Sequence, residues 1–270
     1  MNQIGIMHGR LSPPIEGKIQ AFPKDTWREE FFRAAALGFD ALEFIFDGTH
    51  NPLFTGAGAL EASQVAADAG VEISSVCCDY TMFSPLFGEG REEHVGVLLT
   101  LIQNCAKAGI PRIGVSLEDD CGLRTARDAD EAIDGLRTLT AEALAAGMTV
   151  TLETSLHLHN VFALLERVGA PNLKLNFDLG NSCCVGEDTP RVIEALGDRI
   201  GGVHIKDRTR LLGTTVPLGE GDVDFPECFQ SLRRIGYEGV LLIQAARGEN
   251  DTETAGGYRR FVLDLLADGR

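Results

Sequence analysis

Short apolar runs rich in β-branched residues recur along the whole chain, and this recurrence limits the fold more than any other feature of the sequence. Each run has five to eight residues, the usual length of a buried β-strand. The runs cover residues 3–7, 41–46, 71–78, 112–117, 148–153, 173–178, 201–206 and 239–244. A chain with eight such strands is expected to place all of them in a core.

The segments between these runs carry apolar residues at helical spacing. "WREEFFRAAALG" stops at Gly38, "GALEASQVAADAG" at Gly70 and "DEAIDGLRTLTAEALAAG" at Gly147. Glycine readily adopts the left-handed backbone conformation that ends a helix. "ECFQSLRRIG" and "GYRRFVLDLLADG" continue the series toward the end of the sequence. The pattern therefore predicts strands that alternate with helices.

The size of the repeat favours one fold. A chain of 270 residues with eight strands has about 34 residues per strand–helix unit, as a (β/α)8 or TIM barrel does. An open doubly wound α/β sheet is the alternative. It would need a glycine-rich phosphate turn, and the first turn, "HGRLSPP", lacks the GxGxxG spacing. Since no linker or low-complexity tract is present, we predict a single α/β TIM-barrel domain over residues 1–270.

The composition excludes several classes of partner. A net charge of −16 argues against nucleic acid and against an anionic membrane surface, because both need clustered basic residues. No run approaches the roughly 18 apolar residues of a membrane span, and the opening residues lack the pattern of a signal peptide. The seven cysteines show no two-residue spacing, which is typical of reduced thiols. We therefore expect a cytoplasmic protein.

Polar residues stand at the ends of the predicted strands, where a (β/α)8 barrel builds its active site. The last four strands end in Glu153, Asp178, His204 and Gln244. Two carboxylates, an imidazole and an amide oxygen suit Mn²⁺, Mg²⁺ or Co²⁺ better than a thiolate-preferring metal, with Zn²⁺ as a further option. The alternative is that each residue only terminates its strand. Within the barrel fold, however, the four predict one divalent metal site.

Several segments resemble one known family. "TLETS", "NFDLGNS", "GVHIKDR", "LGEGDVDF" and "IQAARG" are similar to successive signatures of the xylose isomerase-like barrel superfamily, in its sugar phosphate isomerase/epimerase branch. The opening "IGIMHGRLSPP" and "AAALGFDALEFIFD" are similar to the same branch, so the resemblance covers nearly the whole chain. The resemblance implies a metal held by Glu153, Asp178, His204 and the residue at 244. It also implies paired bases at the first and fourth ligands, which are glutamates in related ketose 3-epimerases.

The sequence departs from this pattern at Gln244, where the family would have glutamate. Glutamine can offer its amide oxygen to a hard cation, but it cannot accept a proton at neutral pH. An epimerase needs a base on each face of its substrate, whereas aldose–ketose isomerisation needs only one. We therefore expect a metal-dependent isomerase or epimerase of carbohydrate metabolism, with Glu153 as the base. It would act on a ketose, cyclitol or sugar phosphate through a metal-stabilised enediolate.

Further residues at the strand ends are candidates for binding the substrate. Arginine suits phosphate or carboxylate, although these cations could instead balance nearby acidic residues. Glu43 could bind sugar hydroxyls or form a surface salt bridge, and Asp207 could orient a metal ligand. The candidate substrate-binding residues are His8, Arg10, Glu43, Lys206, Asp207, Arg208 and Arg247.

Two other functions remain open. The superfamily contains abasic-site endonucleases, but Asn181 stands where these carry a histidine, and the net charge disfavours DNA. A non-catalytic sugar-binding barrel that has lost a catalytic glutamate at position 244 is the other alternative. The loop "TMFSPLFGEG" (81–90) is a candidate lid, and a metal role for His157 and His159 is a minor possibility. Homodimers or homotetramers are common among such barrels, although no patch in the sequence indicates one.

Overall fold

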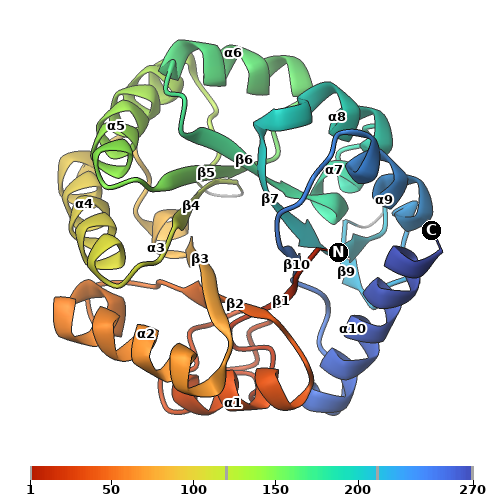
Figure 1. The fold of residues 1–270 in the computed structure, drawn as a ribbon. Helices are drawn as coiled ribbons and strands as arrows, with labels where there is room; N and C mark the ends of the chain where they lie inside the picture. Colours follow the sequence, from red (N-terminus) through yellow and green to blue (C-terminus); the bar gives the residue numbers. More distant parts are fainter. Residues whose placement is uncertain (1, 119–120, 211–212, 269–270) are drawn as a thin grey trace. The chain divides into compact units, whose positions relative to one another are not determined.

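The computed structural model (Figure 1) describes residues 2–118, 121–210 and 213–268. The contacts of the chain define two compact units. The first unit comprises Met1–Glu43, Ala69–Glu72 and Asn176–Arg270. The second comprises Phe44–Asp68 and Ile73–Leu175. Strands β2 (Ala41–Ile45), β3 (Glu72–Cys78) and β6 (Leu173–Asp178) have residues in both ranges. The pairing of β2 with β1 lies in the first unit, and the pairings of β3 with β4 and of β6 with β5 lie in the second. The single domain over residues 1–270 stays a prediction.

The first unit contains parallel strands in the order β2-β1-β10-β7. These strands are β1 (Ile4–Met7), β2 (Ala41–Ile45), β7 (Ile200–Ile205) and β10 (Leu241–Ile243). Gly5 pairs with Ala41 on one side and with Leu242 on the other. A Cβ at this glycine would lie 2.7 Å from Leu242 Cδ2 and 3.0 Å from the Ala41 carbonyl oxygen. The close approach of β1 to its two neighbouring strands therefore requires a glycine at position 5.

The helices of the first unit are amphipathic. They are α1 (Trp27–Ala36), α7 (Leu179–Cys184), α8 (Thr189–Leu196), α9 (Phe225–Arg234) and α10 (Asp251–Ala267), with a 3-10 turn, η3 (Gly197–Arg199). Helix α9 shows why they form: Asp224 caps it by accepting the Glu227 N–H at 3.1 Å, and Pro226 stands in its first turn. It buries Phe225 and Phe229 on one face.

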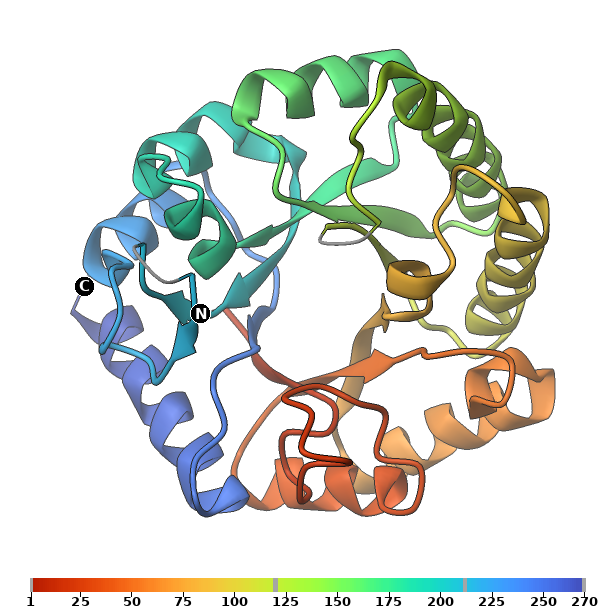
Figure 2. The same cartoon turned by 180° about the vertical axis from the view of Figure 1, so that it is seen from behind.

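Two irregular segments of the first unit lie next to strand ends. A long loop, residues 8–26, connects β1 to α1 and is the red loop at the bottom of Figure 2. A short antiparallel hairpin of β8 (Asp207–Arg208) and β9 (Thr215–Val216) follows β7. Both segments follow the carboxyl ends of parallel strands, and that is where α/β proteins place their functional residues.

The second unit repeats the same construction. Its parallel strands follow the order β3-β4-β5-β6, and they are β3 (Glu72–Cys78), β4 (Arg112–Leu117), β5 (Thr149–Thr154) and β6 (Leu173–Asp178). Its helices are η1 (Pro52–Phe54), α2 (Gly56–Ala69), α3 (Tyr80–Phe83), α4 (Arg91–Lys107), α5 (Ala126–Ala145) and α6 (Leu158–Val168). Thr125 and Asp128 form a capping box at the start of α5.

The predicted secondary structure agrees closely with the structure. All eight predicted strands are present, and the limits of seven differ by no more than one residue from those expected. Gly38, Gly70 and Gly147 have φ angles of +80°, +69° and +70°, so they end helices as predicted. The candidate lid contains a helical turn at its start, and Phe83 in it is 86% exposed. Helices α4 and α8 were not among the predicted segments.

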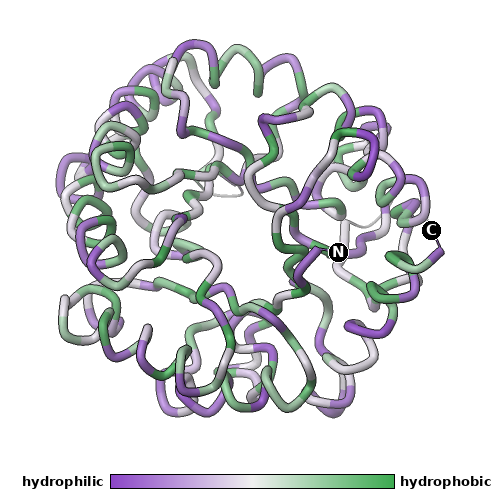
Figure 3. Tube along the Cα trace, in the orientation of Figure 1, coloured by the Kyte–Doolittle hydropathy of each residue, from purple (hydrophilic) through white to green (hydrophobic). Residues whose placement is uncertain are grey.

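The hydropathy pattern explains the arrangement within each unit. Figure 3 shows hydrophilic and hydrophobic residues alternating along the helices of both units, as expected for helices that bury one face. The strands are almost entirely buried. In the described part of the chain, no helix has both the length and the hydropathy to cross a membrane. The seven cysteines are all free, in agreement with the predicted reduced thiols. The cytoplasmic location stays a prediction.

Candidate active site

His204 lies on β7 and is fully buried. Its Nε2 atom lies 2.7 Å from Glu43 Oε2 and 2.9 Å from the side-chain amide of Asn176. A carboxylate only accepts hydrogen bonds, so Nε2 is assigned the proton and donates to Glu43. The Asn176 NH₂ group, which lies 3.4 Å from Nδ1, can then donate only to that atom. The lone pair of the ring is therefore on Nδ1, which lies 4.0 Å from Asp178 Oδ2. The Glu43 carboxylate thus fixes the orientation of the His204 ring.

The placement of Glu43 excludes one of its two sequence-based expectations. We predicted a contact with substrate hydroxyls or a surface salt bridge. The Glu43 side chain, in the middle of β2, is buried with 1% of the residue exposed, so the surface salt bridge is wrong and the substrate contact stays a prediction. The bond to His204 directs its carboxylate into the protein. Glu43 therefore accepts a hydrogen bond from the His204 imidazole and does not lie at the surface.

Asp178 ends β6 and begins α7. Its Oδ1 atom caps that helix by accepting the Asn181 N–H at 2.8 Å, and this bond fixes the carboxylate. Its Oδ2 atom lies 2.8 Å from Lys206 Nζ. Asp178 Oδ2 and His204 Nδ1 thus face each other 4.0 Å apart, with the predicted substrate-binding Lys206 beside them. Metal–ligand bonds of about 2.0–2.2 Å allow one cation to bridge such a pair.

Gln244 follows β10 and is 5% exposed. Its backbone N–H donates to the Ile205 carbonyl at 3.1 Å, and its Nε2 donates to Gln20 Oε1 at 3.0 Å. Its own Oε1 atom is buried and has no hydrogen-bond partner among the described residues. A buried carbonyl oxygen without a partner costs about 1–3 kcal/mol and calls for an explanation. An amide oxygen of this kind fits a hard cation.

Glu153 belongs to the second unit, where it stands near the end of β5 opposite Ser116 of β4. It is 9% exposed, although a carboxylate at a strand end is more often solvated. His157 and His159 follow at the start of α6, and both are exposed, with parallel rings 6.4 Å apart.

Arg10 and Arg247 support the backbone around the long 8–26 loop. Arg10 donates from Nε to the Ala245 carbonyl at 3.1 Å and from Nη1 to the Ile19 carbonyl at 2.5 Å. Arg247 donates from Nε to the same Ile19 carbonyl at 3.1 Å and from Nη1 to the Ser12 carbonyl at 2.9 Å. Both guanidinium groups thus hold the loop, and the substrate contact expected of each stays a prediction.

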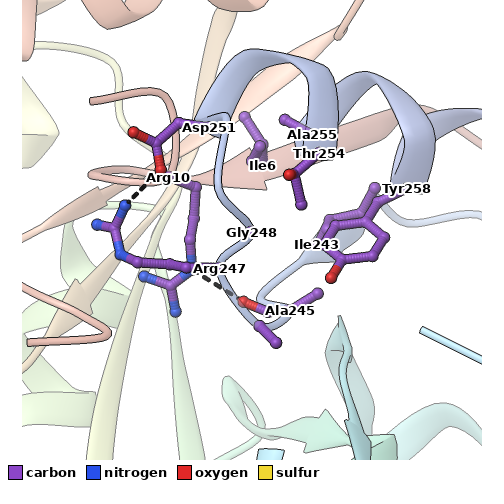
Figure 4. Close-up of a pocket in the computed structure, with 11 residues that line it drawn as sticks. Ile6, Arg10, Ile243, Ala245, Arg247, Gly248, Asp251, Thr254, Ala255 and Tyr258 are labelled. Carbon is purple, nitrogen blue, oxygen red and sulfur yellow. Dashed lines mark hydrogen bonds and ion pairs between the residues drawn. The ribbon is translucent and has the colours of Figure 1, made fainter. Parts of the chain in front are cut away.

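A cavity in the first unit lies between the end of β10 and helix α10. Figure 4 shows Arg10 and Arg247 on one side of it and Tyr258 on another, with Arg247 also paired to Asp251. Its volume of about 10 Å³ holds about one water molecule. The cavity is therefore too small for a sugar.

Asp207 and Arg208 hold the loops that follow β7. Asp207 is fully buried, and its Oδ2 accepts the N–H groups of Gly219 at 2.8 Å and Gly221 at 2.9 Å. A Cβ at Gly221 would collide with the Asp207 carboxylate, which explains the glycine in the "LGEGDVDF" motif. Arg208 donates to Asn181 Oδ1 at 2.7 Å and to the Gly213 carbonyl. These bonds support the loops, and the substrate contacts expected of both residues stay predictions.

His8 is a core residue. It is fully buried, its ring packs edgewise against Phe22 and Phe31, and its Nε2 lies 3.2 Å from the Trp27 carbonyl oxygen. Burial lowers the pKa of His8 to about 3, so the ring is neutral at physiological pH. The substrate contact expected of His8 stays a prediction.

Sequence reasoning missed three polar residues of the first unit. Glu30 is fully buried on α1, where Trp27 and Phe31 flank it on the apolar face. Its position at helical spacing within that apolar face could have predicted its burial. Asn176 precedes Asp178 by two residues on β6 and therefore shares its face. Gln20 lies in the 8–26 loop, and no sequence pattern marks it.

These features define a class of protein: α/β repeats whose strand ends carry buried carboxylates, an imidazole and an amide. The chain matches the family described as xylose isomerase-like TIM barrel over residues 31–261, and it belongs to that family. The predicted (β/α)8 barrel fold is thereby confirmed, and the doubly wound alternative is wrong.

The individual relatives include sugar epimerases. The L-ribulose-5-phosphate 3-epimerase UlaE of Salmonella paratyphi A is 27% identical over 259 residues, which cover 90% of this chain and 91% of the relative. A solved structure of a xylose isomerase domain protein from Planctomyces limnophilus has a TM-score of 0.78 at 19% identity, with 98% and 97% of the two chains covered. That of an L-ribulose 3-epimerase has a TM-score of 0.78 at 20% identity, covering 99% and 95%.

Proposed function

We propose that this protein is a divalent-metal-dependent enzyme that isomerises or epimerises a sugar, a cyclitol or a sugar phosphate. The observation that carries the proposal is the facing pair of Asp178 Oδ2 and His204 Nδ1. The names of its relatives, which are sugar epimerases, support the same substrate class.

The residues proposed to hold the metal are Glu153, Asp178, His204 and Gln244. Support comes from donor chemistry, since the first three are buried carboxylate and imidazole residues, the kinds that hold metal ions. The Gln244 oxygen, which has no hydrogen-bond partner in the described part of the chain, would supply a fourth donor, and this one is neutral. Oxygen and imidazole donors without a thiolate favour Mn²⁺, Mg²⁺ or Co²⁺, with Zn²⁺ as an option. When bound, the cation would polarise the substrate carbonyl and offset the charge of the enediolate.

Glu153 is proposed to remove the proton next to the carbonyl. General-base assistance of this type contributes about 10² to 10⁴ in rate. Glu43 keeps the lone pair of His204 on Nδ1, so the imidazole remains a ligand and does not compete for the proton. The chain thus separates the two roles: His204 binds, and Glu153 moves the proton.

Gln244 determines which reaction is favoured. Its amide cannot take up a proton, so the second base of a two-base epimerase is missing from this position. A single base can return the proton to the neighbouring carbon on the same face, which is an aldose–ketose isomerisation. We therefore propose one-base isomerisation, with a two-base epimerisation as the alternative if another residue supplies the second base.

The proposed substrate contacts are fewer than those expected from the sequence. Lys206, beside Asp178, is retained as a candidate contact. Arg10, Arg208 and Arg247 donate to loop carbonyls, so they give no reason to favour a phosphorylated substrate over a free sugar. An oligomer of two or four chains stays a prediction.

The test is a screen of ketoses, aldoses and their phosphates with Mn²⁺ in heavy water, with the product and the deuterium position determined by NMR. One-base isomerisation predicts deuterium at the carbon next to the carbonyl and an aldose–ketose product pair. The Glu153→Gln variant is expected to lose exchange and retain metal, whereas Glu166→Gln, at an exposed position, serves as the control. Sugar binding without exchange would support the non-catalytic barrel instead.

A further inference from the structure

We infer that Gln20, in the loop after β1, is a positioning residue that turns the Gln244 amide so that its oxygen faces the metal site. The inference rests on the proposed function for the identity of the ligand. Gln244 Nε2 donates to Gln20 Oε1 at 3.0 Å, and Arg10 Nη2 donates to the same oxygen at 3.3 Å. Gln20 thus joins the side chain after β10 to an arginine that follows β1.

The identities of the atoms in this chain of bonds follow from chemistry. A guanidinium group only donates, so the Gln20 atom that faces Arg10 is its oxygen. That oxygen accepts only, so the Gln244 atom that faces it is the nitrogen. The orientation of both amides is therefore set by the charge of Arg10, without reference to the metal.

Arg10 is itself held in place. Its Nε and Nη1 atoms donate to the carbonyls of Ala245 and Ile19, and the residue is 7% exposed. Ala245 directly follows Gln244 in the chain, so one arginine fixes the backbone beside the ligand and, through Gln20, its side chain. Such a network restricts the amide to one of its two orientations before any cation binds.

The orientation matters because the two ends of an amide behave oppositely toward a cation. The oxygen is a donor of electron density, whereas the NH₂ group would repel the metal. With Nε2 bound to Gln20, the buried Oε1 of Gln244 is the end left without a hydrogen-bond partner in the described residues. Gln20 therefore fixes the Gln244 amide in the orientation that presents its oxygen, not its NH₂ group, to a metal ion.

The same network selects an amide over a carboxylate at position 244. A glutamate there would place an oxygen about 3.0 Å from Gln20 Oε1, so two acceptors would face each other. Rotating the Gln20 amide would relieve this contact, but it would turn an NH₂ group toward Arg10. Gln20 and Arg10 thus match the glutamine that stands here in place of the family glutamate.

The experiment compares Gln20→Met with Gln20→Glu. Methionine has a similar size and no acceptor, whereas glutamate keeps an oxygen for both Arg10 and Gln244. Mn²⁺ affinity, measured by electron paramagnetic resonance of the free ion, is expected to fall about 10- to 100-fold in Gln20→Met. It should stay within about threefold of the original protein in Gln20→Glu. Gln64→Met on the exposed face of α2 is the matched control.

A second measurement separates this inference from the proposed function. In the metal-free protein, the side-chain NH₂ protons of Gln244 should exchange with solvent at least tenfold faster in Gln20→Met than in Gln20→Glu. Unchanged exchange in Gln20→Met would overturn the inference whatever the protein does with metal. Accelerated exchange in a protein that binds no Mn²⁺ would support the orienting role and overturn the proposed metal enzyme. Equal Mn²⁺ affinity in all variants would overturn the role of Gln20 in ligand placement.

Discussion

The buried Glu30 carboxyl predicts a pH dependence of stability that can be worked out from the structure. Glu30 is fully buried on α1, and its Oε2 accepts the Gly9 N–H at 2.6 Å. Burial raises the pKa of Glu30 from 4.5 to about 7, although the bonds from Ser12 and Gly9 and the charge of Arg247 partly oppose the shift. The folded protein therefore holds a proton that the unfolded chain has already lost.

The sign and size of the effect follow from this shift. Below pH 4.5 the carboxyl is protonated in both states, and its contribution to stability is fully present. As pH rises toward 7, only the unfolded chain releases the proton, so the contribution is progressively lost. The difference of about 2.5 pKa units corresponds to about 3 kcal/mol in the free energy of unfolding. Above pH 7 the loss is complete and constant.

The assay is urea unfolding of the original protein and of Glu30→Gln between pH 5 and 8. Glutamine does not titrate, and other groups, such as the buried His8, contribute equally to both proteins and cancel in the difference. The variant should therefore gain about 2–3 kcal/mol relative to the original protein across this range. Glu29→Gln at the exposed neighbouring position is the control, expected to change stability by less than about 0.5 kcal/mol. A Glu30→Gln difference that stays constant with pH would refute the reasoning.

Three further predictions concern the loops and the site. Gly221→Ala should lower the free energy of unfolding by about 1–3 kcal/mol, because the new Cβ would collide with Asp207. Gly96→Ala is the control, since a Cβ there would meet no atom within 4 Å. Equal losses of stability for the two variants in urea unfolding would contradict the predicted collision. Glu43→Gln should weaken Mn²⁺ binding about 10- to 100-fold by calorimetry, since His204 would lose its carboxylate; unchanged affinity would remove Glu43 from the site. Chelation of the metal should lower the melting temperature in proportion to its binding free energy, and a melting temperature unaffected by Mn²⁺ or chelator would count against a bound ion.

The strands and the strand-end residues were predictable because their pattern is local. Alternating apolar runs and helix-ending glycines follow from backbone and burial preferences that act within a few residues. The polar residue that ends each strand is then identified by position alone. The prediction therefore reached Asp178, His204 and Gln244 without knowledge of any contact.

The partners of these residues could not be predicted, because the contacts link distant segments. Glu43 and His204 are 161 positions apart in the chain, and Gln244 and Gln20 are 224 apart. The partners of Arg10 were unpredictable for the same reason: a guanidinium group suits phosphate, but it also suits backbone carbonyls, and the fold shows that it donates to those of Ala245 and Ile19. The residue type indicates which groups a side chain can bind, and the fold determines which group it contacts.

The environment of Gln244 bears on whether a glutamine at this position marks a decayed site. Random loss of a catalytic glutamate would leave neighbours still arranged for a carboxylate, namely donors directed at both of its oxygens. The neighbouring Gln20 instead presents an acceptor, which suits an NH₂ group, and Arg10 holds that acceptor in place. A side chain whose surroundings match its own hydrogen-bonding pattern is integrated into the fold. The surroundings of Gln244 therefore support the proposed one-base isomerisation over the non-catalytic barrel.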